Sequence, residues 1–432
     1  MTSFLLTIDE QTGATAPVFD EVFLWIRSGK STFTGTLDPH LSAFGAVRGE
    51  NVDFVRIALA VFSADRSVPR QARGSDWNAR DFELTVEVGN PTAWQTQAAS
   101  LAETVGFLTG DKWTFTFTQG APNPADGGEL ELDDPSPAAT ALLSGGADSA
   151  AGALLKALDL AKGSTLQLVS HFSATSISPF QKELVRRIRA AAPEITVVHR
   201  QANLNRSSKR LDGTSFRNEP SSRSRSLLFL ALGLAAAERS SQPLQIPENG
   251  FASLNPPLGP ERRGSLSTHT THPRFLRDIQ QVLTDAGAHG LIHNPFQGLT
   301  KGEMFRQIAE RVGESTASAY LSSTNSCAHT DARYSKVAAG SSCGVCFGCL
   351  VRRASFHAAG VADATEYLSN DAANRYAAFV GQKSIVEAMH DFTREDPKPR
   401  MVMTMSLPDD YPPGAALDLC KRGVAELRVF LP

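Results

Sequence analysis

The stretch TALLSGGADSAAGALL, Thr140–Leu155, joins a short apolar run to small apolar residues through a loop of two glycines, two serines and an aspartate. The apolar run is typical of a buried strand, and the segment AAGALLKALDLA that follows is typical of a helix. Because glycine has no Cβ, its backbone amide can approach a phosphate closely. The start of a helix adds unpaired N–H groups and a partial positive charge. The stretch therefore predicts a strand–loop–helix unit with an anion site at the loop.

From about residue 138 onward, strand-like segments alternate with helix-like segments. The strand-like segments are TALL, TLQLVSHFS, EITVVHR and PLQIPENG, and the helix-like segments between them are AAGALLKALDLA, PFQKELVRRIRAAA and SRSLLFLALGLAAAER. This spacing indicates βα units, which build a parallel sheet with helices on both faces. We therefore predict an α/β fold with a doubly wound parallel sheet, in which ligands bind at the carboxyl ends of the strands.

The first part of the chain has a different pattern. DFELTVEVG and KWTFTFTQG alternate with period two, as half-buried strands do, and VDFVRIALAVFSAD is a long apolar run bounded by turn residues. The next stretch, QGAPNPADGGELELDDPSPA, is rich in Pro, Gly and Asp and is typical of a linker. The predicted domains are a β-rich accessory or partner-binding domain over 1–135, the α/β domain over 136–360 and a helical extension over 361–432.

Composition limits the class of protein. The chain has 432 residues and a hydrophobic fraction of 41%, which is enough for two or three domains with real cores. Its formal net charge of −3 gives no support to bulk nucleic-acid binding. The start, MTSFLLTIDEQTG, has no basic region, and no apolar run approaches the roughly 18 residues of a membrane helix. We expect a cytoplasmic protein without a membrane segment.

The predicted loop contains the groups that a phosphate site needs. Its candidate phosphate-binding residues are Ser144, Gly145, Gly146, Ala147, Asp148 and Ser149. Amides and hydroxyls would donate to phosphate oxygens, whereas the Asp148 carboxylate would repel them, so we assign it to Mg²⁺ that bridges the phosphates. The loop lacks the lysine of a Walker loop and the spacing of a dinucleotide fingerprint. The alternative is a tight strand-to-helix turn with capping serines.

Four of the five cysteines lie close together in the sequence. Cys327, Cys343, Cys346 and Cys349 have the spacing C-x15-C-x2-C-x2-C, whereas Cys420 stands alone in a helical pattern, as a core residue does. Four thiolates can surround one Zn²⁺ and leave no position for water, so such a zinc would be structural. An iron–sulfur cluster is the other metal reading, and free buried cysteines or a redox pair are the alternatives without a metal.

Together these motifs resemble one branch of the PP-loop ATP pyrophosphatases, the 7-cyano-7-deazaguanine synthases of queuosine biosynthesis. The similar segments, in the order of that family, are SGGADS, SSRSRSLLFLALGLAAA, NPFQGLTKGEMF and Ser326-Cys327 with CGVCFGCLVRRASF. Residues 1–135 and the tail have no counterpart in the compact biosynthetic enzymes. The segment ENGFASLNPPLGPERRGSLSTHTTHPRFL resembles a subgroup of longer synthase-like proteins from bacterial anti-phage operons, such as those of the Qat system. One departure, HFSATSISPFQKEL in place of an aromatic-Gly-Gln-Arg-His segment, leaves nitrile formation open.

The resemblance implies a Rossmann-like fold and ATP-dependent ligase chemistry. The carboxylate of 7-carboxy-7-deazaguanine would attack the α-phosphorus of ATP, and an amine would then displace AMP. The resemblance assigns Asp148, Lys301 and Arg225 to catalysis together with Mg²⁺, and we assign His171 to ATP binding. The amine would be ammonia, as in biosynthesis, or an amine of a partner protein from the same operon. A homodimer also stays open.

Six further residues are candidates for substrate binding. They are Arg223, Asn249, Arg262, Arg263, His269 and His272. The arginine pair would clamp a carboxylate, Asn249 would read a base edge, and the histidines would contact anionic groups. For the charged residues and for Lys301 the alternative is a solvated surface position. Two other functions stay open: a nucleotide-binding scaffold of a defence complex that docks through residues 1–135, and a tRNA-modifying thiolase.

Overall fold

The structure is a computed structural model of the chain. It describes residues 1–14, 19–70, 79–120, 136–172, 176–221, 223–256, 269–328, 335–382 and 386–431. None of the helices in these ranges is long and apolar enough to cross a membrane.

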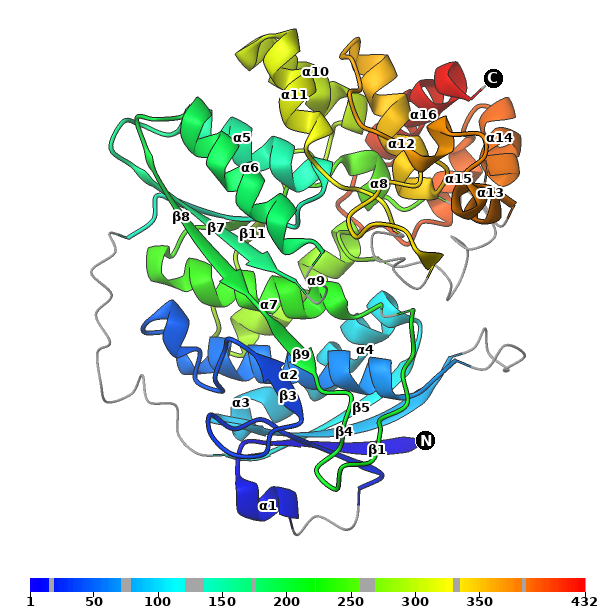
Figure 1. Cartoon of the computed structure of the whole chain (residues 1–432). Helices are drawn as coiled ribbons and strands as arrows, with labels where there is room; N and C mark the ends of the chain where they lie inside the picture. Colours follow the sequence, from blue (N-terminus) through cyan, green and yellow to red (C-terminus); the bar gives the residue numbers. More distant parts are fainter. Residues whose placement is uncertain are drawn as a thin grey trace.

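A five-stranded parallel sheet forms the centre of the α/β region (Figure 1). In spatial order its strands are β11 (Ile292–His293), β10 (Leu244–Gln245), β6 (Ala139–Leu142), β7 (Thr165–His171) and β8 (Thr196–Ala202). Every neighbouring pair in it is parallel. The predicted parallel α/β sheet is therefore confirmed, although the short strand β11 was not predicted.

Helices cover both faces of this sheet. They are α5 (Ala147–Asp159) and α6 (Ser178–Ala191) on one face and α7 (Arg225–Ala237) on the other. Successive residues of a strand point to opposite faces. Accordingly, Ala141 and Leu143 belong to the core under α5 and α6, whereas Leu142 belongs to the core around α7. The apolar run that was predicted as a buried strand is thus buried on both sides.

The strand order reverses between β6 and β10. β7 and β8 extend the sheet on one side of β6, while β10, which comes later in the chain, lies on its other side. In doubly wound folds such a reversal opens a crevice at the carboxyl ends of the strands, and ligands bind there. The loop that begins at Ser144 leaves β6 at this point.

The N-terminal part of the chain contains a second parallel sheet. Its strands, in spatial order, are β2 (Glu21–Leu24), β1 (Thr2–Thr7), β4 (Asp81–Val88) and β5 (Lys112–Gln119). The helices of this part are α1 (Glu10–Ala14), α2 (Gly49–Ser67), α3 (Pro91–Thr96) and α4 (Ala98–Thr109). The two segments with period two are confirmed as β4 and β5.

The apolar run VDFVRIALAVFSAD is part of the long helix α2, so the N-terminal part is a mixed α/β unit rather than a mainly β domain. Almost every residue of α2 is buried. A helix that is buried on all sides has no polar face, so its sequence lacks the 3.6-residue period. Periodicity alone cannot distinguish such a run from a buried strand, which is why the sequence misled us.

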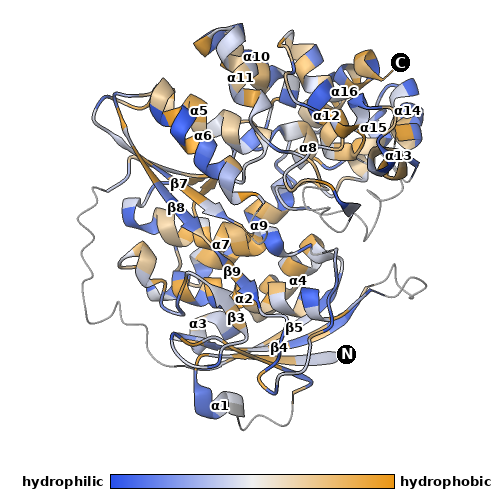
Figure 2. Cartoon of the chain, in the orientation of Figure 1, coloured by the Kyte–Doolittle hydropathy of each residue, from blue (hydrophilic) through white to orange (hydrophobic). Residues whose placement is uncertain are grey.

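α2 packs against α7, and the two helices share one hydrophobic core. Phe54 and Ile57 of α2 belong to the same core as Leu227 and Leu234 of α7. In Figure 2 the hydrophobic residues of α7 lie at the centre of the molecule, between the two sheets. A short antiparallel pair, β3 (Phe33–Gly35) with β9 (Leu204–Arg206), adds a second connection. Packing therefore crosses the predicted domain boundary, which itself stays a prediction.

Helices dominate the rest of the chain. They are α8 (Gly250–Ser253), α9 (Pro273–Asp285), α10 (Lys301–Val312), α11 (Glu314–Ser322), α12 (Phe347–Ala359), α13 (Arg375–Gln382), α14 (Val386–Arg394), α15 (Pro399–Met403) and α16 (Pro413–Phe430). α16 packs against α12, α14 and α15. Cys420 is fully buried in this cluster, as expected of a core residue.

Candidate functional site

The loop after β6 is a compact turn that its own serines hold. Gly145 has a φ of +97°, which L side chains rarely adopt. The hydroxyl of Ser149 donates to the carbonyl of Gly146 over 3.0 Å and accepts from the amide of Ser144 over 3.1 Å. The Ser144 hydroxyl accepts from the amide of Gly146 over 3.2 Å and lies 2.9 Å from the Ser149 hydroxyl. The hydroxyls that we predicted to bind phosphate therefore hold the loop in shape.

A cavity of about 560 Å³ opens beside this loop. Ser144, Gly146 and Ser149 form part of its wall, and Gly146 is the N-cap of α5. The amides of the first helical turn and the helix dipole favour an anion at this wall. The apolar part of the lining is Leu142, Phe172, Ile177, Phe229, Leu230, Ile246 and Pro247. About half of the lining is polar or charged, and a cavity of this size that joins an apolar wall to polar groups suits a small polar ligand.

Arg225, the first residue of α7, lines this cavity. Its side chain is exposed, yet desolvation by the surrounding protein lowers its pKa, as expected of a group that projects into a cavity. No carboxylate of the described residues forms an ion pair with its guanidinium, and desolvation is the one cause of its shift. The neighbouring Ser226 hydroxyl is buried and has no hydrogen-bond partner among the residues that the structure describes. A guanidinium in this setting is well suited to bind a carboxylate or a phosphate.

Arg223 has a different environment from the one that we predicted. Its side chain is buried, and its guanidinium donates to the carbonyl of Thr109 in α4 over 2.9 Å. Burial lowers its pKa to about 10, and the charge of Arg70 acts in the same direction. Although Arg223 touches the cavity wall, its hydrogen bond goes to the N-terminal unit. It therefore connects the two units in this structure, and a role in substrate binding remains only a prediction.

Asp148 and Lys301 form a buried ion pair behind the loop. Lys301 Nζ lies 2.7 Å from Asp148 Oδ2, and the two side chains are 9% and 11% exposed. Burial acts to lower the pKa of Lys301, but the charges of Asp148 and Glu248 outweigh it and raise this pKa. Neither residue is part of the cavity lining. The structure thus brings two predicted catalytic residues together, but it pairs them with each other.

Asn249 supports Asp148 rather than facing the cavity. Its Nδ2 donates to Asp148 Oδ1 over 3.3 Å and lies 3.3 Å from Glu248 Oε1. Its Oδ1 accepts from the amide of Ala252 over 2.8 Å and so caps α8. The side chain is fully buried. Both ends of the amide are thus used within the protein, and the role of Asn249 in reading a base edge stays a prediction.

The start of α10, which carries Lys301, is held from the C-terminal tail. Thr300 and Glu303 form a capping box, a motif that the sequence TKGE could have revealed. Glu426 of α16 accepts hydrogen bonds from the Thr300 hydroxyl and, over 3.2 Å, from the amide of Gly302. Burial raises the pKa of Glu426. Sequence reasoning missed Glu426, because its contact with α10 spans more than a hundred residues.

His171 lines the cavity as a neutral ring. Its Nε2 donates to the carbonyl of Leu204 over 3.0 Å. Burial lowers its pKa to about 4, and the charge of Arg225 adds to this effect. Near neutral pH it therefore offers a hydrogen-bonding and stacking surface without a positive charge. Its predicted contact with ATP fits this place and stays a prediction.

The remaining predicted substrate residues do not gather at the cavity. His269 stacks on Phe107 with 4.3 Å between ring centroids, and its Nδ1 lies 3.0 Å from the Phe107 carbonyl oxygen. His272 is the N-cap of α9, and burial lowers its pKa to about 3. In this structure both histidines have partners within the protein, and their contact with an anionic ligand stays a prediction. Arg262 and Arg263 lie outside the described residues.

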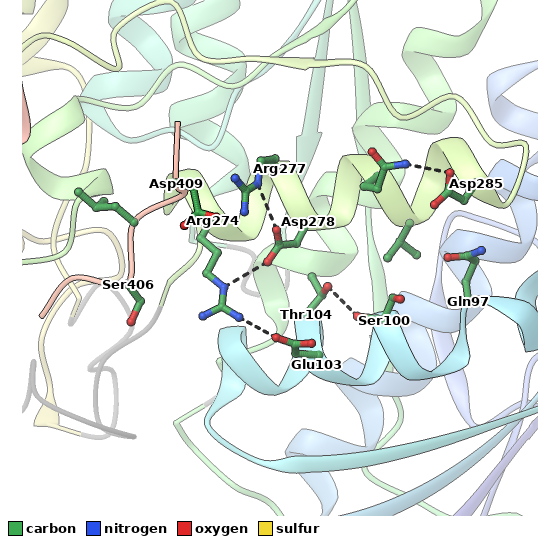
Figure 3. A pocket seen from close by; sticks show the side chains of 13 residues that line it. Gln97, Ser100, Glu103, Thr104, Arg274, Arg277, Asp278, Asp285, Ser406 and Asp409 are labelled. Carbon is green, nitrogen blue, oxygen red and sulfur yellow. Dashed lines mark hydrogen bonds and ion pairs between the residues drawn. The ribbon is translucent and has the colours of Figure 1, made fainter. Parts of the chain in front are cut away.

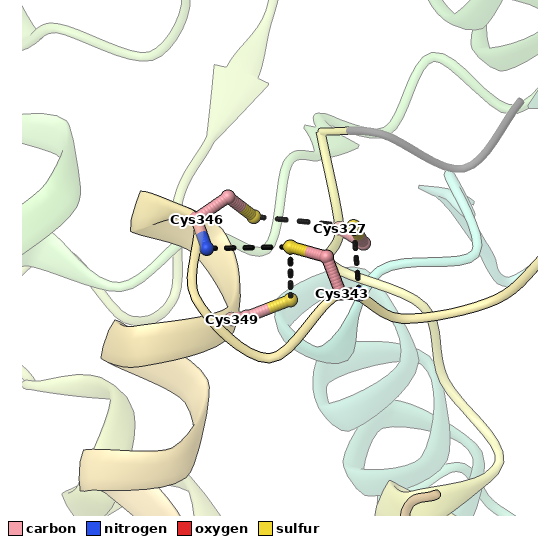
Figure 4. Close-up of side chains that lie close together, drawn as sticks. All are labelled: Cys327, Cys343, Cys346 and Cys349. Atoms are coloured by element: carbon pink, nitrogen blue, oxygen red, sulfur yellow. Dashed lines mark hydrogen bonds between the residues drawn. The ribbon is translucent and has the colours of Figure 1, made fainter. Parts of the chain in front are cut away.

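The predicted cysteine cluster is confirmed (Figure 4). The four buried sulfurs of Cys327, Cys343, Cys346 and Cys349 all lie within 4.8 Å of one another. The Sγ–Sγ distance is 3.9 Å both for Cys343–Cys349 and for Cys346–Cys327. Tetrahedral zinc with Zn–S bonds of about 2.3 Å requires sulfurs about 3.8 Å apart. The residues thus fit a four-thiolate metal site such as zinc, with no position left for a substrate.

Two residues that the sequence did not single out as ligands connect this cluster to the phosphate loop. The amide of Asn325 donates to the carbonyl of Gly145 over 2.9 Å. The hydroxyl of Ser326 accepts from the amide of Ala147 over 3.4 Å. Asn325, Ser326 and Cys327 also line the cavity. The segment that leads into the metal site therefore buttresses the loop.

A second hollow, of about 530 Å³, lies between α4 and α9 (Figure 3). Both of its arginines are paired with carboxylates: Arg274 lies 2.7 Å from Glu103 and 3.3 Å from Asp278, and Arg277 lies 3.4 Å from Asp278. Arginines that already pair with carboxylates gain little from an anionic ligand. We therefore take the cavity beside the loop as the candidate site.

Part of the chain is similar to known enzymes. Over 150 residues the chain is 33% identical to a 7-cyano-7-deazaguanine synthase of Novosphingobium aromaticivorans, which corresponds to 33% of this chain and 54% of that enzyme. Over 101 residues it is 33% identical to a 7-cyano-7-deazaguanine synthase of Myxococcus xanthus, 22% of this chain and 39% of that enzyme. No family model and no solved structure matches the chain. The chain thus spans about half the length or less of the curated relatives it matches, and over that part it is similar to 7-cyano-7-deazaguanine synthases.

Proposed function

We propose that this protein is an ATP-dependent enzyme that adenylates a carboxylic acid of the 7-deazaguanine class and transfers the acyl group to an amine. One observation carries the proposal: the loop of residues 144–149 at the sheet reversal and the guanidinium of Arg225 face one cavity. The partial similarity to two 7-cyano-7-deazaguanine synthases supports the substrate class.

ATP would lie with its phosphates at the start of α5 and its base against the apolar wall. A carboxylate oxygen of the acid attacks the α-phosphorus, the bond to the bridging oxygen of the β-phosphate breaks, and pyrophosphate leaves with the bonding electrons. Arg225 neutralises negative charge on the acid or the phosphates, and the loop amides orient the α-phosphate. An amine nitrogen then attacks the acyl carbon, AMP leaves, and the amine loses a proton to water.

Asp148 would hold Mg²⁺, which supplies neutralisation of phosphate charge when it is bound. A carboxylate oxygen is the ligand type that this ion prefers. Asn249 donates from its Nδ2 to both Asp148 and Glu248, so Glu248 offers a second carboxylate close by. Lys301 balances the charge of this pair from behind the loop. The four cysteines would hold a structural zinc that keeps residues 325–327 against the loop.

The acceptor and the setting belong to the same proposal. Ammonia would give an amide or, with a second ATP, a nitrile, whereas an amine of a partner protein would give a covalent conjugate. The resemblance of the longer chain to synthase-like proteins of anti-phage operons favours a partner amine and a defence role.

The test is pyrophosphate release from ATP and Mg²⁺ with and without 7-carboxy-7-deazaguanine, followed by mass spectrometry of the product. We expect release that depends on the acid and falls at least about 100-fold in Arg225→Gln, because one charged contact to a transition state is worth about 3 kcal/mol. Arg217→Gln, an exposed position outside the cavity lining, is the matched control. ATP binding without any release of pyrophosphate would instead favour a nucleotide-binding scaffold.

A further inference from the structure

The entrance to α7 is built by an aspartate of the N-terminal unit. Asp65, in the last turn of α2, is fully buried. Its Oδ2 accepts from the amide of Arg223 over 2.8 Å, from the amide of Ser224 over 3.0 Å and from the hydroxyl of Ser224 over 2.6 Å. These are the two residues that precede Arg225 in the chain. One carboxylate oxygen therefore fixes the direction from which the chain enters α7.

The N-cap residue of α7 does not cap its own helix. Ser224 is the N-cap of α7, but its side chain makes no capping bond to the helix, because its hydroxyl donates to Asp65. A negative charge near a helix N-terminus is favourable. Asp65 supplies that charge from 159 residues away. The start of α7 thus depends on α2 for its charge and for its shape.

Asp65 is itself held on its other side. Arg80 Nη2 lies 2.5 Å from Asp65 Oδ1 and 2.7 Å from Asp111 Oδ2, and Arg70 lies 2.7 Å from the same Asp111 oxygen. All of these side chains are at most 8% exposed. A buried carboxylate with charged partners on one oxygen and three donors on the other has little freedom to move. Because Asp65 is held in place, its hydrogen bonds also hold residues 223 and 224 in place.

We propose that Asp65 is a positioning residue for Arg225, so that the N-terminal unit is a working part of the ligand site and not a detachable accessory. The proposal deepens the proposed function and rests on it, since it assigns Arg225 to the ligand. Arg225 lacks an ion-pair partner among the described residues, so only its helix fixes where its guanidinium points. Loss of Asp65 would let the first turn of α7 shift while its apolar body stays packed on α2.

The test is a double-mutant cycle on ATP binding, measured by calorimetry with Mg²⁺. We expect Asp65→Asn and Arg225→Gln each to raise the Kd for ATP about tenfold, and the double variant to be no weaker than Arg225→Gln alone. Ser224→Ala, which keeps Asp65 and removes the hydroxyl donor, should raise the Kd less. Leu84→Ala, in the same core but on β4, controls for lost stability: its Tm should fall without a change in the Kd.

The outcomes separate the two proposals. If the wild-type chain binds no ATP, the proposed function fails. If the chain binds ATP and Arg225→Gln weakens binding, the proposed function stands, and Asp65→Asn then tests the positioning role. That role is overturned if Asp65→Asn binds ATP as tightly as the wild type. It is also overturned if the effect of Asp65→Asn adds in full to that of Arg225→Gln in the double variant. Should Asp65→Asn fail to fold, Ser224→Ala in the same cycle decides, because it leaves every buried charge in place.

Discussion

The two polar walls of the cavity are built in different ways. The loop of residues 144–149 takes its shape from hydrogen bonds among its own residues, which lie no more than five positions apart, and Asn325 and Ser326 support it from outside. The start of α7, which presents Arg225, is held by an aspartate 159 positions earlier in the chain. The shape of the loop therefore follows largely from its own short sequence. The start of α7, in contrast, depends on the packing of the N-terminal unit against α7.

The largest effect is expected at the local wall. Asp148→Asn should lower pyrophosphate release about 100-fold or more, because the carboxylate that would hold Mg²⁺ is lost. It also leaves Lys301 buried without its counter-ion, so the variant should lose stability. The double variant Asp148→Asn with Lys301→Met controls for this: we expect it to regain stability and to stay inactive. Recovery of release in the double variant would show that Asp148 acts only through the ion pair.

Removal of a metal from the four cysteines should loosen the loop of residues 144–149. Because the four cysteines lie next to the segment that buttresses Gly145 and Ala147, a chelator should destabilise the fold and weaken ATP binding together. A metal present at 1,000 times its Kd contributes about 4 kcal/mol, so the Tm should fall by several degrees. Elemental analysis identifies the metal. A chain that contains no metal, or whose Tm ignores the chelator, contradicts this coupling.

The stability of the fold should depend on pH through His171, the buried histidine of the cavity. Burial lowers the pKa of His171 from 6.5, the value of an exposed histidine, to about 4 in the folded chain. Between these values the unfolded chain binds more protons, so the free energy of unfolding should rise with pH across this window and fall as pH drops toward 4. The contribution is on the order of 3 kcal/mol. His171→Asn should make the pH dependence of chemical unfolding shallower, and an unchanged slope would argue against a buried neutral ring.

The smallest effect is expected at the contact between α16 and α10. Glu426→Gln keeps a hydrogen-bond acceptor for Thr300 and Gly302 but removes a charge from the helix N-terminus. We expect a loss of about 1 kcal/mol in stability and a change of less than threefold in pyrophosphate release. A larger effect on pyrophosphate release would mean that the tail positions Lys301 as strongly as α2 positions Arg225. The site would then depend on a third distant element.

The contrast also explains how much the sequence could predict. The sheet, its flanking helices, the loop and the cysteine cluster follow from patterns within about 25 residues, and the structure has them. The roles of Asp65, Asn249 and Glu426 come from contacts between distant segments, which no local pattern contains. The sequence could not foresee the contacts of His269 and His272, because a polar residue in a turn has the same sequence signal whether it faces a ligand or caps a helix. α2 was missed because complete burial removes its period.

The most direct test of the central claim compares two glycines. Gly145 (φ +97°) and Gly163 (φ +80°) both have backbone conformations that strain any L residue, and neither site is crowded for a Cβ. Gly145→Ala and Gly163→Ala should therefore lose similar stability, about 1 kcal/mol each. Calorimetry with ATP and Mg²⁺ should show at least about a tenfold loss of affinity in Gly145→Ala and wild-type affinity in Gly163→Ala. Equal ATP affinity in both variants would contradict the claim that the loop after β6 holds the phosphates.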